Sequence, residues 1–187
     1  MGADLMSDVA AAIMDAAERR MRRGGFNGFS FREIAADVGV KSSSVHYHFP
    51  TKEGLAAAVI KRYTSETADL IERELDKESN PIKVWVKAFR GTLHSQDRMC
   101  PCTVLGASSQ DLPPDVAAEV KRFFKMCHDK LVEEGLAPTE AAQLLSTITG
   151  AMVVANAVND FTVYDNATRV FLKNRKPVPA KMDRLAK

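Results

Sequence analysis

The chain has 187 residues, 45% of them hydrophobic, and a formal net charge of +2 at pH 7. This length suits one large or two small domains, and the hydrophobic fraction is sufficient for a substantial buried core. A charge this close to neutral argues against an architectural protein that holds nucleic acid by phosphate contacts alone.

The sequence shows no targeting or membrane signal. No apolar run approaches the roughly 18 residues that a membrane span requires. The N-terminus carries acids before its apolar residues, unlike the basic start of a signal peptide. Three cysteines, an odd number, argue against a disulfide framework. We therefore expect a soluble cytoplasmic protein with no membrane partner.

The first helix is predicted over residues 5–23, where Gly24 and Gly25 end the pattern. Apolar residues recur there at spacings of three and four, which is typical of one buried helical face. These residues are Leu5, Val9, Ile13, Ala16, Ala17 and Met21.

Two short helices and one long helix are predicted next. Ser30 is a plausible N-cap for the second helix, with Glu33 three residues later as its capping-box partner. Gly39 stands where a left-handed residue is needed to leave that helix. A third short helix is expected over residues 42–49. Thr51 then caps a long fourth helix that reaches about residue 77, with inward residues Leu55, Val59, Tyr63, Leu70, Ile71 and Leu75.

The remainder of the chain also has helical periodicity and no strand pattern. Asn80 and Pro81 are a cap and a first-turn proline, followed by a buried stripe of Ile82, Trp85, Val86, Phe89 and Leu93. A loop around Arg98–Cys102 leads to further helices predicted over residues 103–109, 115–135, 139–158 and 163–173, and the tail is expected to fray. The fold class is therefore all-α with about nine helices. We expect a helix-turn-helix domain over residues 1–52 and a second helical domain over residues 53–187.

The segment "DVGVK" joins the second and third helices with helix-turn-helix spacing. Ile34, Ala35, Val40 and Val45 would hold the two helices at a steep angle. The third helix would then expose three small serines, which allow close approach to DNA and can bond phosphates or base edges. Local charge agrees, because residues 19–52 hold seven Lys or Arg against two acids.

At this point a family resemblance is clear. The stretch "GFNGFSFREIAADVGVKSSSVHYHFPTKEGL" resembles the DNA-binding domain of the TetR/AcrR family of bacterial regulators. The resemblance covers roughly Ile13 to Leu55, and His46 stands where the family usually has a tyrosine. It implies a double-stranded DNA operator as partner, with DNA contacts from Arg32, Lys41, Ser42, Ser43, Ser44, His46, Tyr47, His48 and Lys52.

The resemblance also implies a C-terminal ligand-binding and dimerisation domain. The helices at 139–158 and 163–173 are the expected homodimer interface, with candidate residues Leu145, Ile148, Gly150, Ala151, Met152 and Ala155. A small-molecule effector of apolar or amphipathic character would shift the spacing of the DNA-binding domains through the long helix at 52–77. Candidate pocket residues are Trp85, Phe89, Leu105, Phe123, Phe124, Met126 and Phe161. Both sets are equally compatible with ordinary core packing.

The cysteines leave a second mode of control open. Cys100 and Cys102 follow Arg98 at the expected start of a short helix, where thiol pKa values tend to fall, and Cys127 precedes His128. A thiol-switched regulator is therefore an alternative to a ligand-released one. The spacing does not match structural zinc, and no metal or cofactor is expected.

Two other classes of protein are compatible with an all-α chain. An enzyme is not expected, because the sequence has no H-E-x-x-H, P-loop or G-x-S-x-G motif. A helix-turn-helix corner also occurs in helical proteins that do not bind DNA. The leading hypothesis is a repressor that binds a palindromic operator as a homodimer and is released by an effector.

Overall fold

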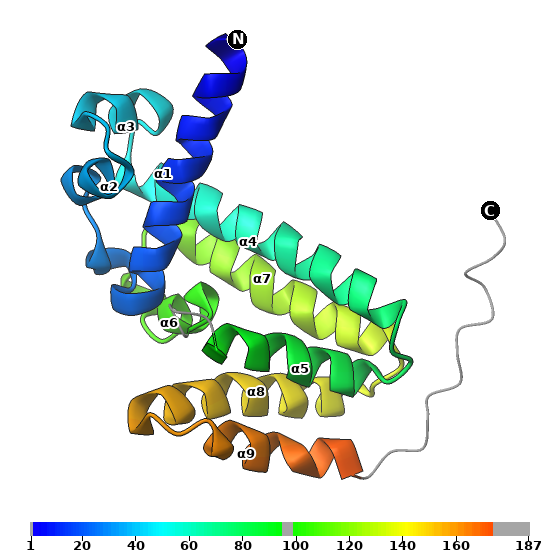
Figure 1. Cartoon of the computed structure of the whole chain (residues 1–187). Coiled ribbons are helices and arrows are strands. Elements are labelled where there is room, and N and C mark those ends of the chain that lie inside the picture. Colours follow the sequence, from blue (N-terminus) through cyan, green and yellow to red (C-terminus); the bar gives the residue numbers. More distant parts are fainter. Residues whose placement is uncertain (1, 95–98, 174–187) are drawn as a thin grey trace, which may run out of the picture. The chain divides into compact units, whose positions relative to one another are not determined.

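The computed structural model describes residues 2–94 and 99–173, with only the backbone for residues 2–7. These residues form nine α-helices and two 3-10 turns and contain no strand, which confirms the all-α prediction (Figure 1). The expected roles of the Leu5 side chain, of Arg98 and of the tail from residue 174 lie outside the described part. The elements are α1 (Gly2–Gly24), η1 (Phe26–Gly28), α2 (Phe31–Val38), α3 (Ser42–His48), α4 (Lys52–Leu75), α5 (Pro81–His94), α6 (Pro101–Gly106), η2 (Ser109–Asp111), α7 (Pro114–Glu133), α8 (Pro138–Val158) and α9 (Thr162–Lys173).

The chain packs as two compact units. Unit 1 comprises Met1–Glu66 and Ser95–Met126, and unit 2 comprises Thr67–His94 and Cys127–Lys187. The helices α4 and α7 each contribute residues to both units. The functional boundary expected after residue 52 stays a prediction, whereas packing alone groups α6 with the helix-turn-helix in unit 1.

The first helix buries the face that its periodicity predicts. Ile13, Ala16, Ala17 and Met21 are fully buried, and α1 ends at Gly24, directly before Gly25, whose φ of 64° lies in the left-handed region. The helix begins three residues earlier than predicted, at Gly2.

The helix-turn-helix is built by the local signals expected of it. Ser30 caps α2, since its hydroxyl accepts from the Glu33 N–H at 3.4 Å and donates to the Glu33 carboxylate at 2.8 Å. Gly39 ends α2 with φ 76°, and its N–H donates to the Ala35 carbonyl at 3.0 Å. Ile34 of α2 and Val45 of α3 are fully buried. This tight turn is the reason that α3 can leave α2 with its polar side outward.

The long helix α4 buries four of its six predicted inward residues, and Leu75 is half-buried. Thr51 caps it by accepting from the Gly54 N–H at 3.0 Å, and Leu55, Val59, Tyr63 and Ile71 are buried. The prediction for Leu70 was wrong, because that side chain is 39% exposed. Consecutive helical residues are rotated by about 100°, so Leu70 cannot share the face of Ile71.

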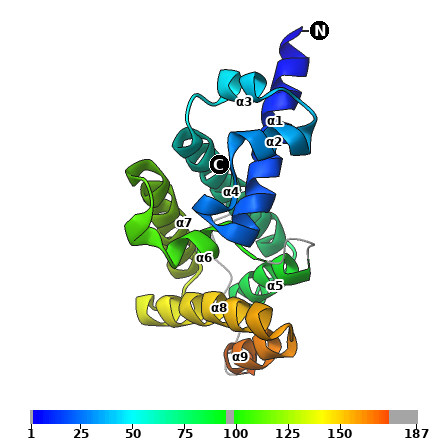
Figure 2. The ribbon, with the colours of Figure 1, turned by 90° about the vertical axis from the view of Figure 1, so that its left-hand side faces the viewer.

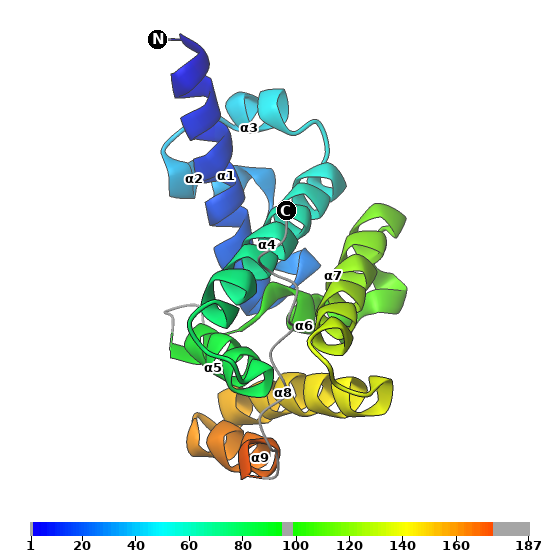
Figure 3. The same cartoon turned by 90° about the vertical axis from the view of Figure 1, so that its right-hand side faces the viewer.

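Unit 2 is organised around α5, α8 and α9. Asn80 caps α5 by accepting from the Lys83 N–H at 3.2 Å, and the whole predicted apolar stripe of α5 is buried. The helices α8 and α9 lie side by side (Figures 1 and 3). The buried Tyr164 hydroxyl of α9 donates to the Val86 carbonyl of α5 at 2.9 Å, which joins α9 to α5.

Prolines set three helix starts differently from the prediction. The helices α6, α7 and α8 begin at Pro101, Pro114 and Pro138. Proline suits the first turn because its missing N–H has no intrahelical partner there. For α8, the Glu140 carboxylate accepts from the Ala137 N–H at 3.1 Å, so the N-cap is Ala137, before the predicted start at residue 139.

The apolar helix α8 differs from the sequence expectation in two ways. By length and composition α8 could cross a membrane. One such helix is weak evidence for a membrane span, because a core helix of a soluble protein passes the same test. Five of the six predicted dimer residues are core residues of the protomer itself, which leaves them little area for a partner: Leu145, Ile148, Ala151, Met152 and Ala155. Gly150 is exposed. Exposed large apolar side chains on α8 and on the neighbouring α9 are Val153, Val154 and Val158 of α8 and Val170 and Leu172 of α9.

Candidate nucleic-acid interface

The short helix α3 buries one residue and exposes most of its polar side chains. Val45 is the buried residue that attaches α3 to the rest of the domain. Tyr47 is 71% exposed, the highest value among the exposed large hydrophobic side chains of the described part. The view onto the side of α2 and α3 shows both helices beside α1 (Figure 2). An exposed tyrosine on a short helix of serines and histidines is a surface that can contact a partner.

The predicted DNA-binding residues gather on this part of unit 1, around α2, α3 and the start of α4. Six are exposed: Arg32, Lys41, Ser42, Ser43, His46 and Tyr47. Three are half-buried: Ser44, His48 and Lys52. Direct contact with DNA remains a prediction for each of them.

Aromatic contacts that the sequence analysis missed position two of these side chains. The His46 ring packs edge-on against Phe31 of α2, with 4.6 Å between ring centroids. The Lys52 ammonium lies 4.5 Å from the Phe26 ring centroid and 4.9 Å from that of Phe29. These cation–π contacts hold the lysine at the first turn of α4. The cluster of phenylalanines at positions 26, 29 and 31 is the sequence signal for these aromatic contacts.

An arginine clamp fixes α1 against α2. Arg20 of α1 donates twice to Asp37, at 2.5 and 2.9 Å, and once to Glu33 at 3.0 Å. Hydrogen bonding from Arg20 lowers the pKa of the Asp37 carboxyl. The pKa of Glu33 is also lowered, first by its bond from Ser30 and then by the charge of Arg20. The clamp holds α1 on α2, and its opposite charges compensate one another.

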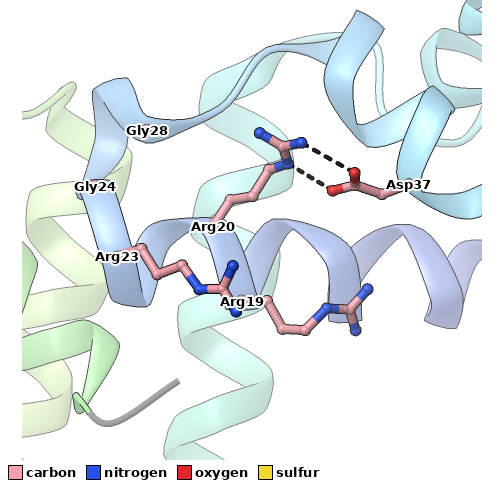
Figure 4. A pocket seen from close by; sticks show the side chains of 6 residues that line it. All are labelled: Arg19, Arg20, Arg23, Gly24, Gly28 and Asp37. Carbon is pink, nitrogen blue, oxygen red and sulfur yellow. Dashed lines mark hydrogen bonds and ion pairs between the residues drawn. The ribbon is translucent and has the colours of Figure 1, made fainter. Parts of the chain in front are cut away.

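A basic pocket of about 550 Å³ adjoins this clamp at the end of α1. Arg19, Arg20 and Arg23 line it with Gly24, Gly28 and Asp37, and Figure 4 shows Arg20 directed at Asp37. Part of the basic window seen in the sequence therefore serves the packing of α1 on α2.

The predicted effector-pocket residues are divided between the units. Trp85, Phe89 and Phe161 belong to unit 2, and the other four belong to unit 1. Trp85, Phe89, Leu105 and Phe123 are buried, whereas Phe124, Met126 and Phe161 are half-buried. The buried Trp85 Nε1 has no acceptor among the described residues. Their role in ligand binding stays a prediction.

The three cysteines are buried thiols. Cys100 and Cys102 lie at the start of α6 in unit 1, and Cys127 lies on α7 in unit 2. The described residues contain no group of three or more His, Cys, Asp and Glu that could hold a metal ion.

The fold and this surface define a helix-turn-helix protein of the kind that binds DNA. Residues 13–59 match the family model described as "Bacterial regulatory proteins, tetR family". Residues 13–59 are therefore a DNA-binding domain of the TetR type. This confirms the resemblance seen in the sequence.

Solved structures support the assignment across most of the chain. A TetR-family transcriptional regulator from Agrobacterium tumefaciens is 26% identical with a TM-score of 0.85, over 90% of this chain and 97% of its own. A TetR transcriptional regulator from Legionella pneumophila is 27% identical with a TM-score of 0.81, over 88% and 96%. The reduced form of NemR from E. coli shares the fold at 20% identity, over 91% and 99%, with a TM-score of 0.76. No curated protein is similar enough in sequence to count as a match.

Proposed function

We propose that this protein is a cytoplasmic repressor that binds a palindromic operator as a homodimer and leaves it when a small molecule binds. The observation that carries the DNA-binding part is the exposed polar face of α3, with Tyr47 71% exposed, in a domain that matches the TetR family model. Regulators of this family do not require catalytic chemistry, so we propose no enzyme activity.

Homodimerisation follows from the geometry of DNA. Two recognition helices can enter successive major grooves only if a two-fold dimer holds them about 34–36 Å apart. The exposed apolar side chains of α8 and α9 supply a surface for such a dimer, because a self-complementary patch serves both protomers. Val154, Val158 and Val170 are about half exposed in the single chain. We propose these residues, with Gly150, in place of the buried ones suggested by the sequence.

The effector proposal is supported by Trp85. A buried N–H that donates to nothing costs free energy, and a ligand that carries an acceptor removes this cost. The neighbouring Phe89 ring stacks on Trp85 at 6.0 Å between centroids. We therefore propose a flat or apolar effector with at least one hydrogen-bond acceptor directed at Trp85 Nε1.

The test is fluorescence anisotropy of the full chain on DNA flanking its own gene and on a scrambled duplex, at two salt concentrations. We expect at least about a thousandfold preference for one duplex, with two protomers bound. If the protein does not prefer the flanking DNA over the scrambled duplex, duplexes selected from a random pool replace the flanking DNA. No specific duplex after selection would contradict the proposal.

Release from the selected duplex then allows a screen for effectors, and Trp85→Phe is the matched variant. It keeps an aromatic ring but removes the N–H, so the response to the effector should weaken while affinity for DNA stays the same. An unchanged response would exclude Trp85 as the polar contact.

A second candidate is a thiol-switched regulator that uses Cys100 and Cys102. One observation favours it, the burial of these two thiols beside Tyr63 and Arg22 in the same unit as the helix-turn-helix.

A further inference from the structure

A cluster of polar and charged groups surrounds the two adjacent thiols at the start of α6. Cys100 and Cys102 are both fully buried, as is Leu105 on the same helix. Tyr63 of α4 is 7% exposed, and Arg22 of α1 holds its guanidinium 5.2 Å from the centre of the Tyr63 ring. The DNA-binding face uses none of these groups.

The surroundings of Cys100 favour its thiolate. Burial by itself would raise the pKa of the Cys100 thiol, but hydrogen bonds from Cys102, Tyr63 and Thr103 outweigh it and lower the pKa to about 6. Burial, and next the negative charge of Cys100, raise the pKa of Tyr63, so the phenol stays protonated and donates. These surroundings favour the thiolate of Cys100, with a second thiol in hydrogen-bond contact.

The cluster is joined directly to α1 and α4. Arg22 Nη1 donates to the carbonyl of Met99, the residue before Cys100, at 2.7 Å. The same guanidinium donates to Glu18 at 2.7 and 3.1 Å, and Glu18 also accepts from Arg62 of α4 at 3.1 Å. Any change in the backbone at Cys100 therefore alters the contacts of α1 and α4.

The helix α6 also packs against the end of α1. A Cβ added at Gly25 would meet the Val104 side chain at 3.7 Å. This is ordinary van der Waals distance, so α6 packs beside the segment that leads into the helix-turn-helix. The charged group at the cluster is Arg22 of α1, which is joined through Glu18 to Arg62 of α4.

We propose that Cys100 and Cys102 are a peroxide-reactive dithiol, and that their oxidation to a disulfide unseats α6 from α1 and α4 and thereby changes operator affinity. The part about operator affinity rests on the proposed function. The oxidant is hydrogen peroxide, because a small and neutral molecule is best suited to reach a buried thiolate.

The reaction has two balanced steps. The Cys100 thiolate attacks one peroxide oxygen, so that an S–O bond forms, the O–O bond breaks and hydroxide leaves. Sulfur is oxidised by two electrons and the peroxide is reduced. The Cys102 thiolate then attacks the Cys100 sulfur, an S–S bond forms, and the second hydroxide leaves. The protons of the two thiols convert the two hydroxides to water.

A disulfide between the two cysteines would strain the start of α6. Cys102 is helical and Cys100 is extended at the N-cap, with φ −67° and ψ 125°. Residues two apart in a helix do not face each other, and a disulfide holds its two Cβ atoms about 3.5–4.5 Å apart, so the bond would distort the first turn of α6. The buried Tyr63 hydroxyl also loses the thiolate acceptor, a costly loss at a buried site.

The test uses the full chain, hydrogen peroxide and the operator selected as above. Mass spectrometry after alkylation should find a Cys100–Cys102 disulfide in the wild type and in Cys127→Ser, the matched control. It should find none in Cys100→Ser or Cys102→Ser. A wild-type chain in which the oxidised sulfurs are not joined overturns the proposal.

The DNA measurement separates this inference from the proposed function. We expect oxidation to change operator affinity about 5–150-fold, with recovery after dithiothreitol. If the reduced chain binds specifically and the disulfide leaves its affinity unchanged, the inference fails while the proposed function stands. If the reduced chain binds no selected duplex, the proposed function fails, and control of DNA binding fails with it.

A pH profile of the intact protein tests the inference without any serine variant that could fail to fold. The rate of alkylation of Cys100 should reach half its maximum near pH 6, the value to which its pKa is lowered. In Tyr63→Phe the midpoint should move upward, because the thiolate loses one donor. An unperturbed midpoint in the wild type would overturn the role of Cys100 as the nucleophile.

Discussion

Truncation of Tyr47 provides the most direct test of the DNA-binding surface. Its side chain is 71% exposed and contacts His48 edge-on, at 5.3 Å between centroids. Tyr47→Ala therefore removes a large side chain from the surface without opening a cavity in the core. The free energy of unfolding should change by less than about 0.5 kcal/mol.

The effect on DNA binding should be far larger than the effect on stability. One recognition contact contributes about 1–3 kcal/mol. A dimer presents two copies of Tyr47, so the loss per operator is about 2–6 kcal/mol for independent sites. That corresponds to a decrease in affinity of roughly 30-fold to 10⁴-fold. Tyr47→Phe should lose less, because it keeps the ring and removes only the hydroxyl.

Anisotropy on the selected operator measures both variants, and thermal unfolding checks that they remain folded. Leu70→Ala is the matched control, since Leu70 is an exposed apolar residue outside the helix-turn-helix. Its affinity should equal that of the wild type. If Tyr47→Ala melts normally and binds within twofold of the wild type, α3 is not the recognition helix.

Four further predictions test separate features. Lys41→Ala should weaken binding to all duplexes alike and reduce the slope of log affinity against log salt by about 2 per dimer; an unchanged slope in a salt titration would exclude a phosphate contact. Gly39→Ala should cost about 1 kcal/mol of unfolding free energy, because φ is 76° and the added Cβ meets nothing within 4 Å; urea unfolding should show a lower midpoint with the same m-value. Tyr164→Phe should cost about 1–2 kcal/mol in the same assay, since the Val86 carbonyl loses its 2.9 Å donor. Val154→Asp should give monomers in light scattering, and a dimer that survives would place the interface elsewhere.

The sequence determined the local architecture of the helix-turn-helix. The cap at Ser30, the left-handed Gly39 and the cap at Thr51 were all predicted from the residues and found in the structure. These features depend on hydrogen bonds that span three or four residues. Short-range signals of this kind can be read without knowledge of the fold, and the family motif extends over the same stretch.

The predicted dimer face shows where the sequence was insufficient. The helix α8 is apolar nearly all round, so its periodicity does not distinguish an inner from an outer face. Packing against α5 and α9 buries Ile148 and Met152 and leaves Val153 and Val154 exposed. The choice between these faces depends on which helices lie beside α8, and that information is absent from α8 itself.

The tertiary structure alone decided which side chains that are distant in the sequence contact one another. Arg22 reaches the Met99 carbonyl across 77 residues, and Arg90 of α5 pairs with Asp165 of α9 across 75. The sequence marked Cys100 as a cysteine at a helix start, but the contact with Tyr63 that sets its ionisation comes from another helix. Local propensity fixes where each helix begins and ends. Only burial of their apolar faces against one another decides which distant side chains meet.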